Sequence, residues 1–598
     1  MHVSVLSRTV LEGFDRAAAR APHDVAATCG DRSMTYQELD TRANGIAWRL
    51  HERGVGPESV VGICLPRGLD MATAVLGVLK AGAGYLPLEP EYPDERLRMV
   101  LSDSGAAALV AQQPVRDRLS RLGWTKPVLE PGNGAAGGPP AQLAGPGNLQ
   151  YVSYTSGSTG QPKGIAMQHG PQISLLDWSR ERYRERPVAL QYFPIATDVA
   201  SLEFLSAWWS AGQIVIATER DRFDIGAIAR LIRQHAITKI LLPVVAMQQL
   251  ARYAVEHPDD VSTLRELITT GDRLTITPEI RLMCERLPGV HLDDHFGSTE
   301  VNVVTAPRHG APSEVWPDSP PVGSPIAGAR VYVLDERQNP NPPNVPGEVY
   351  IGGDPLARGY LGRSALTAAS FVPDPFSPVP GARMYRTGDL GRWRTGGVLE
   401  CLGRADFQIK LRGYRIEPGE IETLLRARTD VKQAAVVALT EGTAGGTEDL
   451  LVAYVVPADL PAGQVLHTEQ LREHLAARLP TFMIPQTFVV LDEMPLTDTG
   501  KIDRRRLPAP GTVEPPFVAP RDDIESAIAE VWADSLGLEA VGVKHNFFQL
   551  GGHSLLVTRI VYELREALEI DFPLAAMFER PTVESFAVHA RSLLAAES

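Results

Sequence analysis

The sequence predicts an α/β protein followed by a separate all-helical domain. Before residue 508, short β-branched runs alternate with amphipathic segments, an alternation typical of helices layered on a sheet. A Pro-rich stretch, Pro508–Pro520, interrupts this pattern, and the apolar segments after it have helical spacing. With 598 residues, the chain is long enough for about three or four folding units.

The first elements are a strand-like segment and an amphipathic helix. Residues 25–36 read VAATCGDRSMTY and contain many strand-forming residues. Directly after them, apolar residues recur at helical spacing, at Leu39, Ala43, Ile46, Ala47 and Leu50. Further along, ITKILLPV (237–244) and LRELITTG (264–271) are short apolar runs that end at Pro or Gly, as buried strands do.

The Pro-rich stretch 508–520 is expected to be a tether. Fully extended, at about 3.1 Å per residue, it spans roughly 40 Å, which lets a following domain relocate. Beyond it, one helical face is marked by Ile524, Ile528, Val531, Trp532 and Leu536, and SLLVTRIVYELREAL (554–568) is a second helix. Residues 520–598 contain 13 acidic and 6 basic residues, so this domain is itself strongly acidic.

The composition excludes several kinds of partner. The chain has 58 Lys and Arg against 72 Asp and Glu, and nucleic acid binding needs a basic surface, so we expect no nucleic acid partner. The four cysteines are too scattered for a disulfide framework or a CxxC metal site. No run of about 20 apolar residues occurs, and the first residues lack a basic segment followed by an apolar one. We therefore expect a cytoplasmic protein with no membrane partner.

The segment LQYVSYTSGSTGQPKG (149–164) predicts a phosphate-binding loop. An apolar strand runs into a loop of small and hydroxylated residues, namely Thr155, Ser156, Gly157, Ser158, Thr159 and Gly160, and Lys163 follows. Small residues let backbone N–H groups approach phosphate oxygens, hydroxyls add donors, and the lysine adds a positive charge. The spacing is not that of a Walker loop. A flexible Ser/Gly turn is the alternative, but this composition after a strand favours phosphate binding.

The loop resembles that of the adenylate-forming superfamily, and specifically that of the adenylation domains of nonribosomal peptide synthetases. Further segments of similar sequence follow in the same order: MTYQEL (34–39), LKAGAGYLPLEP (79–90), FGSTE (296–300), GEVYIGGDPLARGYLG (347–362), YRTGDL (385–390), GRADFQIKLRGYRIEPGEIE (403–422), LPTFMIP (479–485) and PLTDTGKIDRRRL (495–507). The resemblance implies a large N-terminal core (1–405) and a small, mobile α+β C-terminal subdomain (406–507). It also implies the reaction: a carboxylate attacks the α-phosphate of ATP, giving an acyl adenylate and pyrophosphate.

The resemblance assigns nucleotide contacts. Phe296 is expected to stack on adenine, with Gly271 beside it, although the family usually has Tyr at the first position and Pro where Ser298 stands. Asp389 is expected to take the ribose hydroxyls, with Arg404 nearby. The departures from the family pattern at Phe296 and Ser298 remove no catalytic group.

The resemblance also assigns the catalytic residues. Thr299 is expected to contact the α-phosphate, and Glu300 to hold Mg²⁺. Lys501 is expected to bridge the carboxylate and α-phosphate oxygens as negative charge develops, a role that relies on positioning and electrostatics. The C-terminal subdomain is expected to rotate about a hinge at Asp406 between adenylation and thioester formation.

The family's amino acid pocket maps onto Asp198, Val199, Leu202, Leu241, Ile268, Thr270, His295, Val303 and Val304, with Lys501 closing it. An unpaired buried carboxylate is costly, so Asp198 needs a cationic partner, which an α-ammonium supplies. The remaining positions are mostly aliphatic and carry no second charge. This set looks like the family's proline signature, differing mainly at Leu202 and Thr270, so L-proline is the expected substrate. Another compact apolar amino acid is the alternative.

The run HLDDHF (291–296) groups two histidines with two aspartates. Such clusters occur more often at a strand end than at a metal site, so we expect no metal there.

The segment NFFQLGGHSLL (546–556) resembles the attachment site of a peptidyl carrier protein. Two glycines permit a tight turn, and Ser554 then opens a helix, whose N-terminus favours an attached phosphate. Helix capping by this serine is the alternative. The resemblance implies a four-helix carrier domain (521–598), 4′-phosphopantetheine on Ser554, and a phosphopantetheinyl transferase that adds it.

Neither an HHxxxDG condensation signature nor a GxSxG thioesterase signature occurs in the chain. We therefore expect amino acid activation and loading, with downstream synthetase or tailoring enzymes acting on the loaded carrier. An MbtH-like activator is a possible partner by resemblance. The rival interpretations are an acyl-CoA ligase, which the carrier domain and Asp198 oppose, and a non-catalytic scaffold, which Lys163, Glu300, Asp389 and Lys501 oppose.

Overall fold

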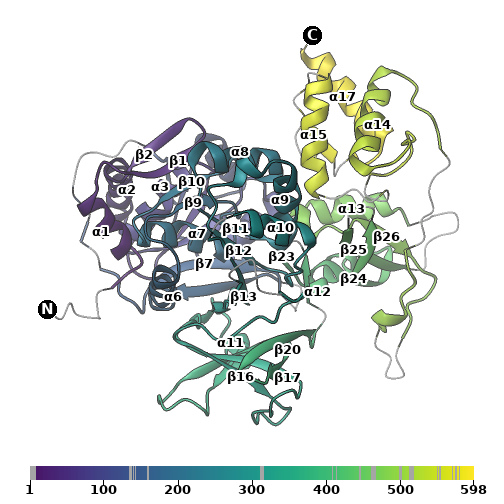
Figure 1. Ribbon diagram of the computed structural model, residues 1–598. Coiled ribbons are helices and arrows are strands. Elements are labelled where there is room, and N and C mark those ends of the chain that lie inside the picture. The colour runs from purple at the N-terminus through teal and green to yellow at the C-terminus, as the bar shows by residue number, and fades with distance from the viewer. Residues whose placement is uncertain are drawn as a thin grey trace. The chain divides into compact units, whose positions relative to one another are not determined.

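The computed structural model describes residues 8–132, 138, 140–141, 143–157, 161–287, 289–309, 316–406, 408–411, 414–443, 446–458, 466–496, 502–510, 517–547, 550, 554–568, 570, 572, 576–577 and 580–597. By internal contacts the chain divides into two units (Figure 1). The first unit comprises residues 1–155, 162–406 and 412–415, and the second comprises 156–161, 407–411 and 416–598.

The largest sheet of the first unit carries most of the expected amino acid pocket. Its strands follow the order β14-β13-β12-β11-β9-β10-β1-β2, with β15 paired to β13. Its inner strands β13, β12, β11, β9, β10 and β1 run parallel. The bounds are β1 (Val25–Cys29), β2 (Arg32–Thr35), β9 (Val188–Gln191), β10 (Gln213–Ile216), β11 (Lys239–Pro243), β12 (Glu266–Thr270), β13 (His291–Ser298), β14 (Asn302–Thr305) and β15 (Arg308–His309).

A second sheet of seven strands carries the start of the phosphate loop. Its order is β18-β8-β7-β4-β3-β5-β6, in which β7 and β8 form an antiparallel hairpin. The bounds are β3 (Val60–Cys64), β4 (Gly84–Leu88), β5 (Ala108–Ala111), β6 (Val128–Leu129), β7 (Leu149–Thr155), β8 (Lys163–Gln168) and β18 (Gly359–Tyr360).

A third sheet, β16-β17-β20-β19 with β21 on β20, completes the first unit. The bounds are β16 (Ala329–Leu334), β17 (Gly347–Gly353), β19 (Phe371–Pro373), β20 (Arg383–Arg394) and β21 (Val398–Arg404).

Helices cover the two larger sheets. They are α1 (Glu12–Arg20), α2 (Tyr36–His51), α3 (Leu69–Lys80), α4 (Asp94–Asp103), α5 (Gln113–Arg121), α6 (His169–Arg182), α7 (Asp198–Trp209), α8 (Ile225–His235), α9 (Val244–Glu256), α10 (Pro278–Arg286) and α11 (Ser364–Ser370). The helix predicted after the first strands is confirmed as α2. Thr35 and Glu38 form a capping box at its start, and the five apolar positions named above are buried. The strands predicted in 237–244 and 264–271 are confirmed as β11 and β12.

The second unit contains a small α+β part. Its described elements are α12 (Pro418–Arg426), β24 (Val431–Thr443), β25 (Gly446–Pro457), α13 (Thr468–Ala476) and β26 (Thr487–Val490). The three strands form one sheet in the order β24-β25-β26. The short strand β22 (Ile409–Leu411) also belongs to this unit, whereas β23 (Tyr414–Ile416) begins in the first unit and ends in the second. An apolar cluster that includes Ile421, Leu425, Leu471 and Leu475 joins α12 and α13 to the sheet.

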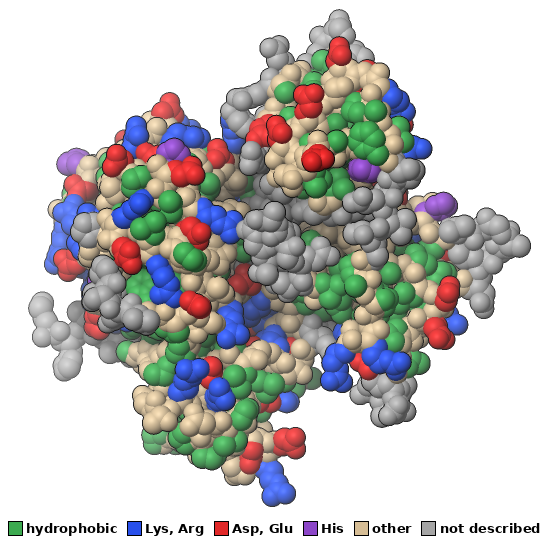
Figure 2. All heavy atoms as spheres, turned by 45° about the vertical axis from the view of Figure 1, so that its right-hand side comes forward, with side chains coloured by type: hydrophobic (Ala, Val, Ile, Leu, Met, Phe, Trp, Pro, Cys, Tyr) green, Lys and Arg blue, Asp and Glu red, His purple; other side chains and the backbone are tan. Residues whose placement is uncertain are grey.

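The helical end of the second unit has an apolar core of its own. Its described helices are α14 (Asp523–Leu536), α15 (Ser554–Leu568) and α17 (Val583–Glu597), drawn in yellow-green to yellow in Figure 1. The core centres on Trp532, Phe547, Phe572 and Phe586, all with no exposed surface. Both helices predicted here are confirmed, and acidic side chains lie on the face of this bundle that Figure 2 shows.

Candidate active site

Three parallel strands bring several expected pocket residues into register. In the pairing of β11, β12 and β13, Leu241 lies opposite Ile268, and Thr270 lies opposite His295. Because side chains alternate along a strand, Leu241, Ile268 and His295 lie on one face of the sheet. The Thr270 hydroxyl donates to the backbone oxygen of His295 at 2.8 Å. One face of these three strands therefore carries Leu241, Ile268 and His295 together.

Helix α7 supplies the expected carboxylate of the pocket. Asp198 is its first residue, and Val199 and Leu202 follow on the first turns. Asp198 is half-buried, and its Oδ1 accepts a hydrogen bond of 3.0 Å from the Thr299 hydroxyl. Burial raises the pKa of Asp198 to about 6, which the Thr299 hydrogen bond opposes. The hydrogen bond thus connects Asp198, expected to bind the substrate ammonium, with Thr299, expected to contact the α-phosphate. Asp198 makes no ion pair with any described residue.

Glu300 lies at the centre of a buried charge cluster. Its side chain has no exposed surface, and its two oxygens lie 3.3 Å from Lys163 Nζ and 2.8 Å from Arg415 Nη1. The Tyr360 hydroxyl donates to Glu300 Oε1 at 3.0 Å. Burial raises the pKa of Glu300, but Arg415 and Lys163 outweigh burial and hold that pKa well below its usual range. Glu300 is therefore ionised at neutral pH.

This ionised carboxylate fits the Mg²⁺ ion that the sequence resemblance implies. Mg²⁺ prefers carboxylate and phosphate oxygens, and a carboxylate can accept about four contacts through its two oxygens. Glu300 would hold Mg²⁺ together with phosphate oxygens of ATP. Among the described residues, no group of three or more His, Cys, Asp or Glu side chains is arranged to hold a metal on its own. In particular, the run 291–296 is a strand in which Asp293 pairs with Arg182 and Arg308.

The described part of the phosphate loop continues β7. Thr155 is paired with Lys163 across the β7–β8 hairpin, and Ser156 and Gly157 follow it directly. The Thr155 hydroxyl is buried and has no hydrogen-bond partner in the described part of the chain, as expected of a donor reserved for a ligand. Ser158, Thr159 and Gly160 lie outside the described residues.

The expected nucleotide contacts lie at strand ends and turns. Phe296 is in β13 and is 9% exposed. Gly271 follows β12 with φ of 93°, a conformation that favours glycine. Asp389 pairs across β20 and β21 with Arg404, whose Nη1 donates to Asp389 Oδ1 at 2.8 Å. The two residues expected at the ribose are thus neighbours in the fold.

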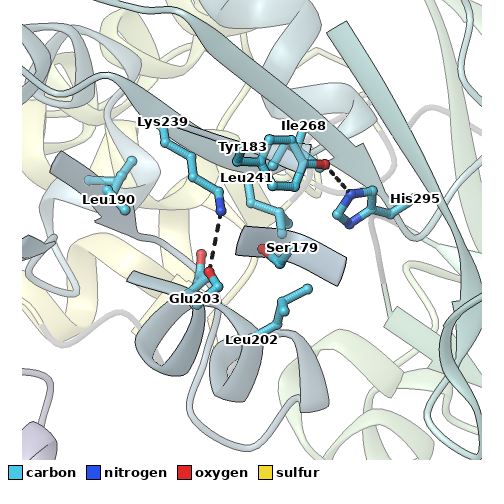
Figure 3. Close-up of a pocket in the computed structure, with 11 residues that line it drawn as sticks. Ser179, Tyr183, Leu190, Leu202, Glu203, Lys239, Leu241, Ile268 and His295 are labelled. Atoms are coloured by element: carbon cyan, nitrogen blue, oxygen red, sulfur yellow. Dashed lines mark hydrogen bonds between the residues drawn. The ribbon is translucent and has the colours of Figure 1, made fainter. Parts of the chain in front are cut away.

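A cavity lies between α6, α7 and the strands β9, β11, β12 and β13 (Figure 3). Four of the nine expected pocket residues line it: Leu202, Leu241, Ile268 and His295. The His295 Nε2 lies 2.7 Å from the Tyr183 hydroxyl, and burial lowers the pKa of His295 to about 3, so the imidazole is neutral. Val303 and Val304 are buried in the neighbouring strand β14.

The cavity also contains charged residues that the sequence analysis did not expect. Lys239 and Glu203 both line it. Glu203 accepts hydrogen bonds from the backbone N–H groups of Tyr192 and Phe193 and from the Gln191 amide, and burial raises its pKa to about 8. The cavity wall is therefore more polar than the aliphatic positions suggested. Lys239 could have been found in the sequence, because it stands two residues before Leu241 on one strand face.

The remaining predicted site residues are Lys501, the hinge residue Asp406 and the attachment residue Ser554. Lys501 lies outside the described residues. Asp406 is the last residue of the 162–406 segment of the first unit, and its carboxylate pairs with Arg404. Ser554 is the first residue of α15, as expected, while its side chain lies outside the described part of the structure.

Three models of protein families match the chain. The AMP-binding enzyme model matches residues 14–361, the AMP-binding enzyme C-terminal domain model matches 420–501, and the phosphopantetheine attachment site model matches 526–589. The chain therefore belongs to the AMP-binding enzymes. It is an adenylating ligase of the nonribosomal peptide synthetase kind, fused to a carrier domain.

Two relatives of similar sequence are named as peptide synthases or synthetases and are longer than this chain. The chain is 40% identical over 583 residues to phosphinothricin tripeptide synthetase PhsB of Streptomyces viridochromogenes, covering 96% of this chain and 48% of the relative. It is 36% identical over 592 residues to tyrocidine synthase 2 of Brevibacillus parabrevis, covering 97% and 16%. The chain thus spans less than half the length of either relative.

Solved structures show the same architecture. An NRPS protein containing adenylation and PCP domains, bound to a vinylsulfonamide inhibitor, superposes with a TM-score of 0.76 at 26% identity, covering 99% of this chain and 98% of that one. A four-domain nonribosomal peptide synthetase bound to AMP and glycine gives 0.58 at 30% identity, covering 98% and 43%. The expected fold class is confirmed: an α/β adenylation core, a C-terminal subdomain and a carrier domain. No helix among the described residues is both long and apolar enough to span a bilayer.

Proposed function

We propose that the chain activates an α-amino acid with ATP and loads it onto its own carrier domain, in the biosynthesis of a nonribosomal peptide or a related natural product. The observation that carries this proposal is the hydrogen bond between Thr299 and Asp198. It places a carboxylate without an ion-pair partner beside the threonine expected at the α-phosphate. An amino acid whose ammonium pairs with Asp198 would present its own carboxylate to the nucleotide.

The chemistry has two steps. First, a substrate carboxylate oxygen attacks the α-phosphorus of ATP, the bond to the bridging oxygen breaks, and pyrophosphate leaves. The phosphopantetheine thiolate on Ser554 then attacks the carbonyl carbon, a thioester forms, and AMP leaves. Both steps depend on orientation and charge stabilisation, which Thr299 and Lys501 would supply. When bound, Mg²⁺ neutralises phosphate charge from its site at Glu300.

L-Proline is the first substrate to test. The similarity of the pocket positions to the family's proline signature supports it, and Leu202, Leu241 and Ile268 provide an apolar surface for a compact ring. Another compact apolar amino acid is the runner-up. Discrimination between such neighbours is weak, about 1–3 kcal/mol per methylene.

The proposal includes partners and location. A phosphopantetheinyl transferase would modify Ser554, and downstream synthetase or tailoring enzymes would use the loaded carrier. An MbtH-like protein is a further candidate partner. We place these reactions in the cytoplasm.

The test is amino-acid-dependent exchange of labelled pyrophosphate into ATP by the full chain. We expect exchange with L-proline above that with other amino acids in a panel. An acyl-CoA ligase would prefer an acid lacking the amino group, and a non-catalytic scaffold would give no exchange. A panel in which a large aromatic amino acid is fastest would refute proline while leaving the enzyme class intact.

A further inference from the structure

The cavity behind Leu202 contains a buried ammonium. Lys239 is 7% exposed, and Figure 3 shows its side chain pointing into the cavity. Its Nζ donates to the Ser206 hydroxyl at 3.3 Å and lies 4.3 Å from the centre of the Tyr183 ring. No carboxylate of the described residues forms an ion pair with it. An ammonium has three N–H donors, so the single hydrogen bond to Ser206 leaves donors that a ligand in the cavity can use.

Three carboxylates lie near this ammonium without forming an ion pair with it. Glu203 accepts from the peptide N–H groups of Tyr192 and Phe193, and Asp293 pairs with Arg182 and Arg308. Glu266 lies opposite Lys239 on β12; its Oε1 accepts from the backbone N–H of Arg184, and its Oε2 is buried without a hydrogen bond in the described part of the chain.

The ammonium is therefore charged and is balanced by Glu266 and Asp293 only from beyond ion-pair distance. Burial lowers the pKa of Lys239 to about 8, while Glu266 and Asp293 oppose the shift, so it remains mostly protonated at neutral pH. A buried charge without a partner is costly, and an incoming anion recovers that cost.

The position of Lys239 follows from two elements. On α7, Asp198, Leu202 and Ser206 are spaced four residues apart and share a face. At 1.5 Å per residue, Leu202 lies about 6 Å and Ser206 about 12 Å along the axis from Asp198. On β11, Lys239 and Leu241 share the face that lines the cavity. One face of α7 therefore leads from the Asp198 carboxylate, past Leu202, to Ser206, and of these three residues Leu202 and Ser206 line the cavity that contains the Lys239 ammonium.

We propose that Lys239 is a specificity-determining residue that makes the deep end of the pocket a site for a side-chain carboxylate. It acts on substrates that extend past Leu202, such as L-glutamate, whose ammonium would pair with Asp198 and whose side-chain carboxylate would pair with Lys239. A proline ring would end beside Leu202 and leave Lys239 untouched. The inference rests on the proposed function, because it takes the substrate to be an α-amino acid.

The experiment compares pyrophosphate exchange with L-glutamate, L-norleucine and L-proline. Norleucine matches glutamate in length but lacks the carboxylate. For the wild type we expect a kcat/KM for glutamate about tenfold or more above that for norleucine, because a buried hydrogen-bonding group strongly rejects an analogue that leaves it unpaired. In Lys239→Met we expect the preference to reverse, with proline exchange changed by less than about threefold.

Controls separate specificity from folding. Lys239→Gln keeps a donor of similar reach without the charge, and should fall between wild type and Lys239→Met in its glutamate preference. Lys80→Met removes another buried lysine, which is 4% exposed and pairs with Asp40 at 2.7 Å. It should leave the relative kcat/KM values for glutamate, norleucine and proline unchanged. Thermal melting shows whether each variant folds.

The outcomes for the two proposals differ. If the wild type exchanges with proline but does not prefer glutamate over norleucine, the role of Lys239 is overturned and the proposed function stands. The same holds if the wild type exchanges with proline and with neither glutamate nor norleucine. A glutamate preference that survives in both folded Lys239 variants would also overturn the role of Lys239. Absence of exchange with every amino acid would instead overturn the proposed function.

Discussion

Arg404 holds the carboxylate of Asp406 through two hydrogen bonds, 2.6 Å from Nε to Oδ1 and 2.7 Å from Nη2 to Oδ2. The same guanidinium donates to Asp389 at 2.8 Å. The residue expected to be the hinge is therefore tied to β20 and β21, at the last position of the 162–406 segment of the first unit. Any rotation about Asp406 starts from a side chain fixed by a bidentate ion pair.

The first prediction concerns this hinge. Asp406→Pro fixes φ near −65° and should impair loading of the carrier more than pyrophosphate exchange, because only loading would require the rotation. Asp406→Ala removes the Arg404 ion pair but leaves φ free, so it should retain loading. Single-turnover rates of the two half-reactions measure both variants. Equal losses in the two half-reactions of Asp406→Pro would contradict the hinge.

The second prediction concerns Lys501. Lys501→Ala should slow adenylate formation by about 10²–10³-fold, the effect of losing one preorganised donor at a developing negative charge, roughly 2.7–4 kcal/mol. Lys432→Ala, which removes a lysine from β24 instead, is the matched control and should keep the wild-type rate. Near-normal adenylation by Lys501→Ala would remove it from the catalytic residues.

Much of the fold could be predicted from the sequence because local patterns determine it. The apolar spacing of Leu39 to Leu50 predicted α2, and the segment 554–568 matched the bounds of α15. Local apolar periodicity survives in the fold because each helix buries its own apolar face.

The site was less predictable because its contacts are distant in the chain. Arg415 lies 115 residues from Glu300, and the two form a 2.8 Å ion pair that no local spacing indicates. Tyr360 donates to the same carboxylate, and the local sequence of its segment (347–362) does not indicate that contact. Lys239 lies in an apolar run that predicts a strand, and only its shared face with Leu241 indicates the pocket.

The third prediction concerns the carrier. Mass spectrometry after treatment with a phosphopantetheinyl transferase and CoA should show one phosphopantetheine on the chain, and an aminoacyl group after addition of ATP and substrate. Ser554→Ala should lose both additions and keep pyrophosphate exchange, because adenylation needs no carrier thiol. Ser535→Ala, in the neighbouring helix α14, should retain both. An unmodified wild-type carrier would refute the attachment site.

The last prediction follows from the raised pKa of Asp198. Burial raises that pKa from 3.8 to about 6, and only the ionised carboxylate can pair with a substrate ammonium. The kcat/KM for exchange should therefore rise with pH, reach half its plateau near pH 6, and level off above it. Asp198→Asn should exchange far more slowly, and its kcat/KM should not show this rise with pH.

Stability should move in the opposite direction. Because the folded state raises this pKa, it binds the proton more tightly than the unfolded chain does. Between about pH 4 and pH 6 the Asp198 contribution to stability therefore falls as pH rises, and above pH 6 the folded protein carries the full cost of the buried charge. Asp198→Asn should consequently melt at a higher temperature than the wild type at pH 7.5, with the difference shrinking towards pH 4. A variant that loses both exchange and thermal stability at pH 7.5 would show that Asp198 supports the fold, and a wild-type pH profile flat down to pH 5 would show that its ionisation does not control substrate binding.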